Sequence, residues 1–428
     1  SKDLPLGFVD RQEKELLVRD FIISNIKEVM IKYGFQYLET PSFEYSDSIG
    51  KFLPDKERPD EGVFSFRDEN KWLSLRYDLT APLARYVAKN FLEIPKPFKR
   101  YQLGTVWRNE KPGPGRFREF LQFDADFVGT KSLQADAELC VMISEILENC
   151  GLTKSEYIIK ISSRKITEEL FKKININENQ QKLTALRALD KIDRLGWDGV
   201  KELLGVGRKD KSGDFTKGAN LKSEDIEVIE TTLKKKSPET EDLAEILKIF
   251  KDYNFTNFEF DPSIVRGLEY YTGVIFEVNL KFDVKNKKGQ VIQFGSIGGG
   301  GRYDNLVNNF GNFDAPATGI SIGLDRLVYA LMQKKEFKVK QSKPVVICVF
   351  DKNSMKEYIN VQTILRTAGI SAEIYPGESK LKKQMEYANK IKSPAVILYG
   401  EDEIKLGKPT LRNLSSGKEQ SIKIKELV

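Results

Sequence analysis

The first part of the chain places apolar residues at helical spacing and then changes to short strand-like segments. Between residues 10 and 33 the apolar positions recur every three or four residues, and Gly34 follows as a helix stop. The strand-like segment FQYLET then runs to Pro41. VFSFRD and WLSLRYDLT continue the strand pattern, and APLARYVAKNF returns to a helical one. The pattern predicts a mixed helix-and-strand fold.

Residues 99–128 predict two antiparallel strands. KRYQLGTVWRNE and RFREFLQFDADFVG are joined by KPGPG, whose Pro and Gly residues are typical of a turn. A helix is expected over residues 131–150. Residues 164–250 then become helical and rich in Lys and Glu, which indicates an insertion between parts of one sheet. The sheet resumes with RGLEYYTGVIFEV and VIQFGSIGGGGRYDNLV, and a helix follows from Gly323.

The last part of the chain has a different pattern. Residues 335–343 form a polar linker, after which apolar strands alternate with helices, as in a small parallel or mixed sheet. We therefore expect an α+β protein with a catalytic-type domain formed by residues 1–163 and 251–334. Residues 164–250 would form the helical insertion, and residues 343–428 a C-terminal α/β domain.

The composition excludes several kinds of chemistry. The chain has 428 residues, three cysteines and no histidine, so a Ser-His-Asp triad is impossible and zinc or copper catalysis is not expected. No apolar run is long enough to span a membrane, no signal pattern begins the sequence, and the cysteine spacing suggests neither a metal site nor disulfides. We expect a reduced, cytoplasmic protein with no metal ligands of its own.

Charge and arginine positions point towards anionic partners. Residues 343–428 contain 15 Lys and Arg against 10 Asp and Glu, which gives +5 of the chain's net +6. This is either a solvated basic domain or a polyanion-binding one. Several arginines elsewhere lie beside apolar residues on predicted strands, and each alone is explained by a structural ion pair. Together they suggest a polyphosphate site: Arg76, Arg108, Arg116, Arg266, Arg302 and Arg326.

The four consecutive glycines in SIGGGGRYDNL match neither a dinucleotide-binding fingerprint nor a P-loop. They fit a tight bulge, or a backbone that a small ligand approaches closely. The sequence alone does not choose between these two interpretations.

These segments together resemble the class II aminoacyl-tRNA synthetases. VWRNE, PGPG and GRFREF are similar to their motif 2, GLDRLVYAL to motif 3, and the first helix with the strand ending at Pro41 to motif 1. RGLEYYTG, GGGGRYDNL and LRYDLT resemble signature peptides of the histidyl-tRNA synthetase family, and the resemblance covers essentially the whole chain. It implies an antiparallel class II sheet flanked by helices and an anticodon-binding C-terminal domain.

The resemblance implies histidine activation with ATP and Mg²⁺, followed by transfer of histidine to the 3′ end of tRNA(His). The carboxylate of histidine is ionised at neutral pH and needs no general base, so positioning and charge stabilisation suffice. Arg108 would bind the α-phosphate, Arg266 would lie near it in place of a metal ion, and Arg326 completes the expected catalytic set. Glu110 would contact the adenine amino group and Phe120 would stack on the ring. Arg116, with Arg326, would reach the outer phosphates or the adenine face.

The resemblance also implies a histidine pocket, which explains the polar opening of RGLEYYTGVIFEV. Tyr270 and Tyr271 would line the imidazole pocket, where Asp126 accepts from the ring N–H and a tyrosine hydroxyl donates to the other nitrogen. The ammonium and carboxylate ends would be held by the remaining expected histidine-binding residues: Asp78, Thr80, Gln122 and Arg266. Without the family resemblance, the tyrosine pair would indicate only strand packing.

The motif 2 loop departs from the form found in most bacterial members at Asn109, Pro114 and Leu121. It resembles a divergent branch found in some α-proteobacteria, which does not require the extra 5′ guanosine on tRNA(His).

Motif 1 implies a homodimer. The alternatives are a non-catalytic, histidine-binding regulatory paralogue of histidine biosynthesis, which would lack the C-terminal domain, and a domain that only senses uncharged tRNA.

The absence of histidine has two explanations. At ordinary usage about nine would be expected in a chain of this length. Drift in a low-GC genome rich in Lys, Asn and Ile would deplete histidine, and so would selection for synthesis during histidine shortage. We favour drift, because those residues are abundant here.

Overall fold

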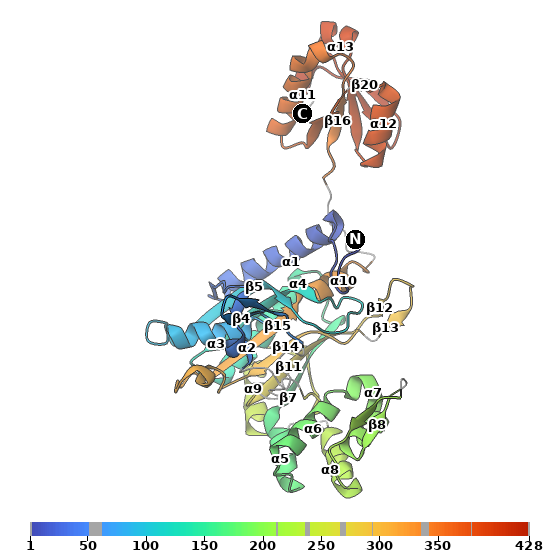
Figure 1. Cartoon of the computed structure of the whole chain (residues 1–428). Helices are drawn as coiled ribbons and strands as arrows, with labels where there is room; N and C mark the ends of the chain where they lie inside the picture. The colour runs from blue at the N-terminus through green and yellow to red at the C-terminus, as the bar shows by residue number, and fades with distance from the viewer. Residues whose placement is uncertain are drawn as a thin grey trace. The chain divides into compact units, whose positions relative to one another are not determined.

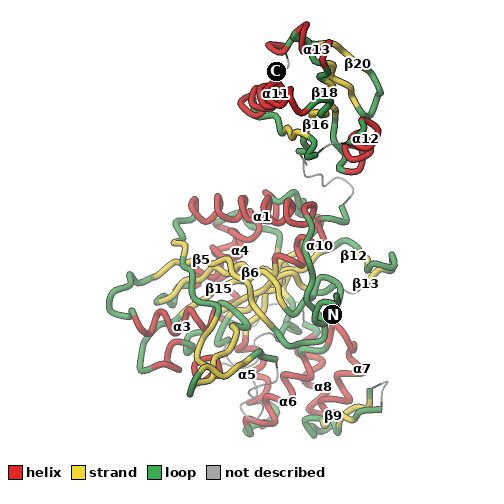
Figure 2. Tube along the Cα trace, turned by 45° about the horizontal axis from the view of Figure 1, so that its top comes forward, coloured by secondary structure: helices red, strands yellow, loops and turns green. Residues whose placement is uncertain are grey.

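The computed structural model describes residues 2–50, 62–210, 213–235, 240–265, 271–292, 294–334, 342–377 and 379–426. The chain divides between residues 338 and 339 into two compact units, which are described separately below (Figures 1 and 2).

An eight-stranded sheet forms the centre of the first unit, in the order β1-β5-β6-β15-β14-β11-β7-β10. The pairs β1–β5 and β7–β10 are parallel and the other pairs are antiparallel, so the expected antiparallel class II sheet is confirmed. The strands have the following bounds: β1 Gln36–Tyr37, β5 Phe98–Trp107, β6 Glu119–Val128, β7 Tyr157–Ser163, β10 Phe258–Phe260, β11 Val274–Leu280, β14 Ser296–Arg302 and β15 Ala317–Gly323.

The four glycines lie within β14, at the middle of this sheet. A Cβ atom on Gly298 would overlap the carbonyl oxygen of Ser321, and one on Gly300 would overlap that of Gly319. Both carbonyls belong to the neighbouring strand β15. Close approach of two strand backbones therefore requires Gly298 and Gly300. The pairing of β14 with β11 also shifts register between Val278, opposite Gly298, and Asn279, opposite Ser296, so the expected bulge lies at the start of the glycine run.

Three helices of the first unit pack together beside the sheet (Figures 1 and 2). Helix α1 contacts α4 and α10, and α4 also contacts β15. The amphipathic spacing predicted α1 and α4 to within three residues at each end. The helices have the following bounds: α1 Glu13–Lys32, α4 Leu133–Asn149 and α10 Leu324–Leu331.

A smaller sheet, β2-β4-β3, lies between β1 and α3 in the sequence. The predicted strand FQYLET contributes only β1 to the structure. Helix α3 begins at Thr80, two residues after the expected site residue Asp78, and packs against the 3₁₀ helix η1. The elements have the following bounds: β2 Phe43–Tyr45, α2 Ser46–Gly50, β3 Ser65–Asp68, β4 Lys71–Leu75, α3 Thr80–Lys89 and η1 Val307–Phe310.

The segment after β7 is helical, as predicted, and also contains a hairpin, β8–β9, that the sequence did not reveal. Its last helix, α9, packs on α4 and β7. A second hairpin, β12–β13, precedes β14. The elements have the following bounds: α5 Arg164–Lys173, α6 Asn179–Leu189, α7 Ile192–Leu204, β8 Gly207–Lys209, β9 Phe215–Lys217, α8 Ser223–Leu233, α9 Glu241–Asp252, β12 Val284–Lys285 and β13 Val291–Ile292.

The second unit is a five-stranded sheet in the order β17-β16-β18-β19-β20, parallel over β17-β16-β18 and antiparallel beyond. Separate apolar clusters include residues of α11 and of α12, as expected for an α/β domain. The short helix α13 was not predicted. The elements have the following bounds: β16 Val345–Cys348, η2 Lys352–Ser354, α11 Met355–Thr367, β17 Ala372–Ile374, α12 Leu381–Lys390, β18 Ala395–Leu398, α13 Glu401–Leu406, β19 Thr410–Asn413, β20 Glu419–Ser421 and η3 Ile424–Glu426.

Among the helices of the described residues, none combines the length and the apolar character needed to cross a membrane.

Candidate active site

Strand β6 presents a row of polar side chains on one face of the central sheet. Gln122, Asp124 and Asp126 alternate with Phe123 and Ala125, so the three polar residues point to the same side. All five are buried. In register with Asp126 are Arg100 on β5 and Gly319 on β15, and in register with Asp124 are Gln102 and Ser321. Buried polar groups in such a row require partners within the protein or from a ligand.

Asp126 has two charged or polar partners inside the sheet. The Nη2 atom of Arg100 lies 2.9 Å from its Oδ2 atom, and the hydroxyl of Tyr303 donates to Oδ1. Burial raises the pKa of Asp126 to about 6, although the Arg100 guanidinium favours the ionised form. Gly319 leaves room for this carboxylate, because a Cβ atom there would overlap Oδ1.

Asp124 connects two of the expected histidine-binding residues. Gln122 Nε2 donates to Asp124 Oδ1 at 2.6 Å, and Thr80 Oγ1 donates to Oδ2 at 3.4 Å. Gln122 Nε2 also donates to Ser321 Oγ at 3.3 Å. Burial raises the pKa of Asp124, and Arg100 opposes that shift. Asp124 thus lies at the centre of a hydrogen-bonded group that the sequence did not reveal.

Asp78 lies at the start of α3, where its carboxylate accepts a hydrogen bond from the backbone N–H of Ala81 at 3.0 Å. Burial raises the pKa of Asp78 to about 6, and this N–H opposes the shift. The negative charge of Asp124 raises the same pKa further, which places the two carboxylates in one electrostatic environment. Four of the expected histidine-binding residues are therefore gathered in one part of the fold: Asp78, Thr80, Gln122 and Asp126.

The tyrosine segment is described only from its second tyrosine onwards. Tyr271 is half-buried, and its Cδ1 atom would lie 3.2 Å from a Cβ atom on Gly301. It packs against the apolar cluster that contains Tyr303, the partner of Asp126. The other two residues expected in this segment, Arg266 and Tyr270, lie outside the described residues.

At the opposite end of β6, Phe120 lies beside a basic residue that directly follows β5. The guanidinium of Arg108 lies 5.2 Å from the centroid of the Phe120 ring, within the range of a cation–π contact. Arg108 Nε also donates to the backbone oxygen of Tyr77 at 3.0 Å, next to Asp78. The structure therefore places the expected α-phosphate residue between the expected adenine platform and the carboxylate group.

Arg326 approaches the same region from the first turn of α10. Its Nε donates to Ser296 O at 3.0 Å, a second nitrogen donates to Phe294 O, and the guanidinium lies 4.2 Å from the centroid of the Phe294 ring. A Cβ atom on Gly115, in the turn between β5 and β6, would lie 3.2 Å from that ring. The next residue, Arg116, is exposed.

Glu110, the residue expected to contact adenine, is exposed in the same loop. Its backbone oxygen accepts from Arg118 Nε at 3.1 Å. The contact of the Glu110 carboxylate with adenine stays a prediction.

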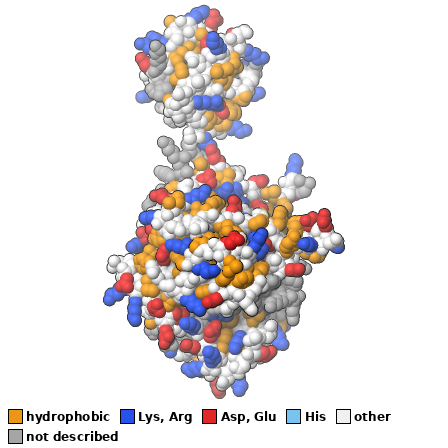
Figure 3. Space-filling view, turned by 90° about the vertical axis from the view of Figure 1, so that its left-hand side faces the viewer, with side chains coloured by type: hydrophobic (Ala, Val, Ile, Leu, Met, Phe, Trp, Pro, Cys, Tyr) orange, Lys and Arg blue, Asp and Glu red, His pale blue; other side chains and the backbone are white. Residues whose placement is uncertain are grey.

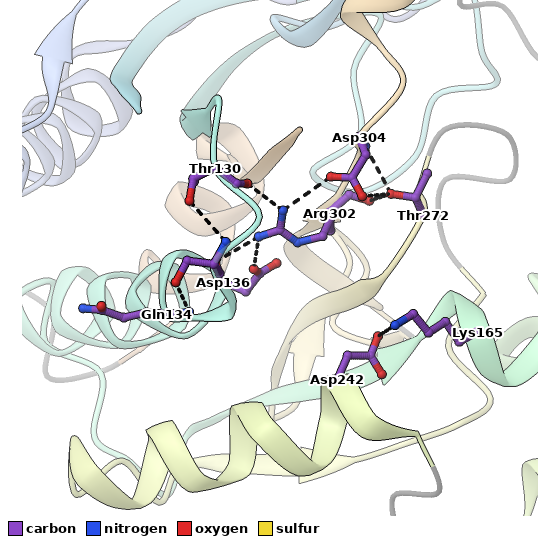
Figure 4. Close-up of polar contacts among 9 residues, drawn as sticks. Thr130, Gln134, Asp136, Lys165, Asp242, Thr272, Arg302 and Asp304 are labelled. Atoms are coloured by element: carbon purple, nitrogen blue, oxygen red, sulfur yellow. Dashed lines mark hydrogen bonds and ion pairs between the residues drawn. The ribbon is translucent and has the colours of Figure 1, made fainter. Parts of the chain in front are cut away.

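Two of the six conspicuous arginines have structural roles instead of phosphate-binding ones. Arg76 donates to the backbone oxygens of Thr40 and Thr105 at 2.6 and 2.8 Å. Arg302 forms an ion pair with Asp136, which is fully buried in the first turn of α4 (Figure 4). The suggestion that all six mark one polyphosphate site was therefore wrong for these two, because buried protein groups already neutralise or bind them.

Arg302 is also the centre of a network that fixes the segments beside the site (Figure 4). Its Nη1 donates to Thr130 O at 2.8 Å, and Asp304 Oδ1 lies 3.4 Å away. Asp304 in turn accepts from Thr272 Oγ1 at 2.9 Å. The network connects β14 to α4 and to the segment that follows Tyr271. Figure 4 also shows a separate ion pair, between Lys165 and Asp242.

The sequence reasoning missed Arg100 and Tyr303, and it took Asp124 only as a possible ion-pair partner of the arginines. The alternation of Gln122, Asp124 and Asp126 in a single strand was a readable signal for Asp124. Arg100 and Tyr303 depend on which strands pair and in what register, and that information is not local in the sequence.

Comparisons with known proteins agree with this geometry. The family model described as "Histidyl-tRNA synthetase" matches residues 7–327, and the "Anticodon binding domain" model matches residues 343–428. The curated histidine–tRNA ligase of Bartonella quintana (strain Toulouse) is 46% identical in an alignment 452 residues long, which covers 99% of this chain and 91% of that protein. That of Rhizobium meliloti (strain 1021) is 46% identical over 454 residues, covering 99% and 90%.

The structural comparison gives the same answer over the whole length. The crystal structure of histidyl-tRNA synthetase from Nostoc sp. PCC 7120 matches with a TM-score of 0.74 and 26% sequence identity, covering 100% of both chains. The two curated relatives come from α-proteobacteria, in agreement with the branch that the motif 2 loop resembles. The chain belongs to the histidyl-tRNA synthetase family.

Proposed function

We propose that the chain is a histidine–tRNA ligase, which activates L-histidine with ATP and transfers it to the 3′ end of tRNA(His). The observation that carries the proposal is the arrangement along β6. One end presents Asp126 with its partners Arg100 and Tyr303, and the other end presents Phe120 beside Arg108. An amino acid with a polar ring and a nucleotide would lie along this strand with their reacting groups between its ends.

In the first step, the carboxylate oxygen of histidine attacks the α-phosphorus of ATP. A C–O–P bond forms and the bond to the β-phosphate oxygen breaks, so pyrophosphate leaves with its electron pair. Arg108 and Arg266 stabilise the charge that develops on the α-phosphate, and Arg326 and Arg116 bind the nucleotide. No proton has to be removed from the nucleophile, which agrees with a chain that lacks histidine.

Mg²⁺ enters the site with ATP, as part of the substrate. In nucleotide complexes Mg²⁺ binds mainly to phosphate oxygens and water. The ion would neutralise charge on the β- and γ-phosphates.

The histidine pocket selects its substrate by hydrogen bonds and charge. Neutral imidazole has one donor and one acceptor nitrogen, so Asp126 accepts from the ring and a hydroxyl from Tyr270 or Tyr271 donates to it. Asp78, Thr80 and Gln122 bind the ammonium and carboxylate ends. Analogues that leave these buried groups without partners would be rejected by roughly 10⁴-fold or more.

The second unit binds the anticodon stem-loop of tRNA(His). Its net charge of +5 over residues 343–428 favours contact with phosphates, and unstacked anticodon bases would be read by side chains. The helical segment 164–250 would contact the acceptor arm. We place the enzyme in the cytoplasm, where tRNA charging occurs.

The functional unit is a homodimer. The edge of the first unit formed by β1 and the sheet β2-β4-β3 has exposed aromatic side chains, a surface that partner association would cover. These side chains are between 42% and 57% exposed: Tyr37, Phe43, Tyr45, Phe66 and Trp72. Figure 3 shows one face of the protein with hydrophobic side chains among Lys, Arg, Asp and Glu residues.

Histidine-dependent exchange between ATP and labelled pyrophosphate, measured without tRNA, tests the proposal. Exchange with histidine and with none of the other amino acids is expected. Binding of histidine without exchange would instead indicate a regulatory, non-catalytic relative.

The tRNA rule is tested separately. Asn109, Pro114 and Leu121 lie in or next to the motif 2 loop, and we propose that this enzyme charges tRNA(His) transcripts without the extra 5′ guanosine. Transcripts with and without that nucleotide should be aminoacylated at similar rates. Strict dependence on the guanosine would contradict the proposal without affecting the exchange reaction.

A further inference from the structure

The segment before α1 lies against the end of the β5–β6 hairpin. The backbone N–H of Arg118 donates to Gly7 O at 2.8 Å, and the rings of Phe8 and Phe64 are 6.1 Å apart in an edge-to-face arrangement. Gly7 has a φ of +86°, and a Cβ atom there would lie 2.6 Å from Arg118 Cγ. A glycine is therefore needed for this close contact.

Arg11 ends this segment and reaches two distant parts of the fold. Its Nε and Nη2 atoms both lie 3.0 Å from Asp325 Oδ1, in the first turn of α10. Nη2 also donates to the backbone oxygen of Glu119 on β6 at 3.3 Å. The other carboxylate oxygen of Asp325 accepts from the backbone N–H of Leu121 at 2.6 Å. Arg11 and Asp325 are thus bound to β6 on both sides of Phe120.

The contacts of Arg11 and Asp325 lie next to two residues expected to bind the nucleotide. Glu119 and Leu121 flank Phe120, the expected adenine platform, and Asp325 directly precedes Arg326, the expected nucleotide-binding arginine of α10. One largely buried ion pair therefore fixes the backbone that carries both residues. The side chains of Arg11 and Asp325 are 12% and 1% exposed, so water screens the pair only weakly.

We propose that Arg11 is a positioning residue for the ATP site. It fixes β6 and α10 relative to each other, so that Phe120 and Arg326 are held ready to bind the nucleotide. Arg11 itself does not touch the substrate. The inference rests on the proposed function, because it takes Phe120 and Arg326 as nucleotide-binding residues.

The shape of the guanidinium explains why arginine is needed. Its nitrogens lie in one rigid plane, so a single side chain can bind the carboxylate and the Glu119 carbonyl in fixed directions. A lysine could keep the contact to Asp325 but would bind the two acceptors without that fixed geometry. Glu15, one helical turn later, lies 3.4 Å from Arg11 Nε and adds a second carboxylate on the same side.

The test compares the two substrates in full-length variants. Pyrophosphate exchange is measured for the wild type, Arg11→Met and Arg11→Lys, with ATP varied at saturating histidine and histidine varied at saturating ATP. Lys14→Ala, an exposed change in the first turn of α1, is the matched control. We expect kcat/KM for ATP to fall on the order of ten- to a hundredfold in Arg11→Met and by less in Arg11→Lys. The KM for histidine should stay within about twofold.

A purely structural role would give a different result. Equal losses for both substrates, or a lower melting temperature with unchanged kinetics, would overturn the inference. If Arg11→Met does not fold, the KM of Arg11→Lys for ATP decides alone. If the wild type shows no exchange, the proposed function fails. ATP affinity measured by calorimetry then still tests Arg11, since equal affinities in wild type and Arg11→Lys would contradict a positioning role.

Discussion

Arg100 and Asp126 are register partners on β5 and β6, and their side chains form an ion pair within the sheet, 2.9 Å between Nη2 and Oδ2. Arg100 is completely buried, and its Nη2 also donates to the backbone oxygen of Leu79 at 3.1 Å. The pair gives Asp126, the proposed imidazole acceptor, a fixed orientation and a compensating positive charge. Asp126 is therefore held before any ligand arrives, as preorganised binding sites require.

Asp126→Asn should remove most of the preference for histidine. The amide is nearly the same size but carries no charge, and it removes the carboxylate that is paired with Arg100. We expect kcat/KM for histidine in pyrophosphate exchange to fall by about 10²-fold or more, with a much smaller change in KM for ATP. Exchange with wild-type KM for histidine would show that Asp126 does not contact the substrate.

Gly319→Ala tests the same pocket without removing any polar group. A methyl group at this position would overlap Asp126 Oδ1, so the carboxylate has to turn away from its partners. We expect a loss of histidine activation comparable to that of Asp126→Asn. Gly205→Ala, where the nearest atom to a new Cβ would be 3.4 Å away, is the control and should keep full activity.

The raised pKa of Asp78 predicts that the stability of the fold depends on pH. Its pKa is raised from the model-peptide value of 3.8 to about 6, so the folded protein binds more protons than the unfolded chain between these two values. Protonation of Asp78 therefore stabilises the folded state relative to the unfolded chain. This stabilisation is complete below about pH 4 and is lost as the pH rises through about 6. The slope cannot exceed about 1.4 kcal/mol per pH unit.

Asp78→Asn provides the comparison. Asparagine keeps an oxygen that can accept from Ala81 N–H but does not ionise. We expect the variant to melt at a higher temperature than the wild type at pH 7.5, and the difference to shrink as the pH falls towards 4. A difference that is independent of pH would contradict the raised pKa. Histidine binding should be weaker in the variant at every pH.

Arg302→Met should destabilise the fold. The variant leaves the Asp136 carboxylate buried without its counter-ion and removes the donor to Thr130 O. Breaking one partner of a buried pair costs about 3–5 kcal/mol, which chemical denaturation can measure. The control is Lys131→Met, in an exposed pair with Asp314 at 3.9 Å, which should leave the denaturation midpoint unchanged. Equal midpoints for the two variants would show that the Arg302 network contributes little.

The sequence predicted the elements that have a strong period. Helix α1 and strands β5 and β6 were found close to their observed bounds, because their apolar positions repeat at 3.6 or 2 residues. Strand β15 was missed, since ATGISIG has small residues in place of the large apolar ones that mark a strand. The short hairpin β8–β9 was missed as well, within a segment dominated by helical patterns.

The site was predictable only in part. Family resemblance selected the residues along β6 and at the start of α3, and the structure brings the described ones together. The contacts that orient them were not predictable, because they join residues far apart in the chain. Arg11 and Asp325 are 314 positions apart, and no local pattern connects them.

Strand β6 also constrains how this enzyme can evolve. Phe120 and Asp126 are six residues apart on one strand, which at about 3.3 Å per residue separates them by roughly 20 Å. Inserting or deleting one residue between them would turn Asp126 to the other face of the sheet and break its pairing with Arg100. Substitutions can accumulate along this strand, but its length should remain unchanged in every enzyme that shares this pocket.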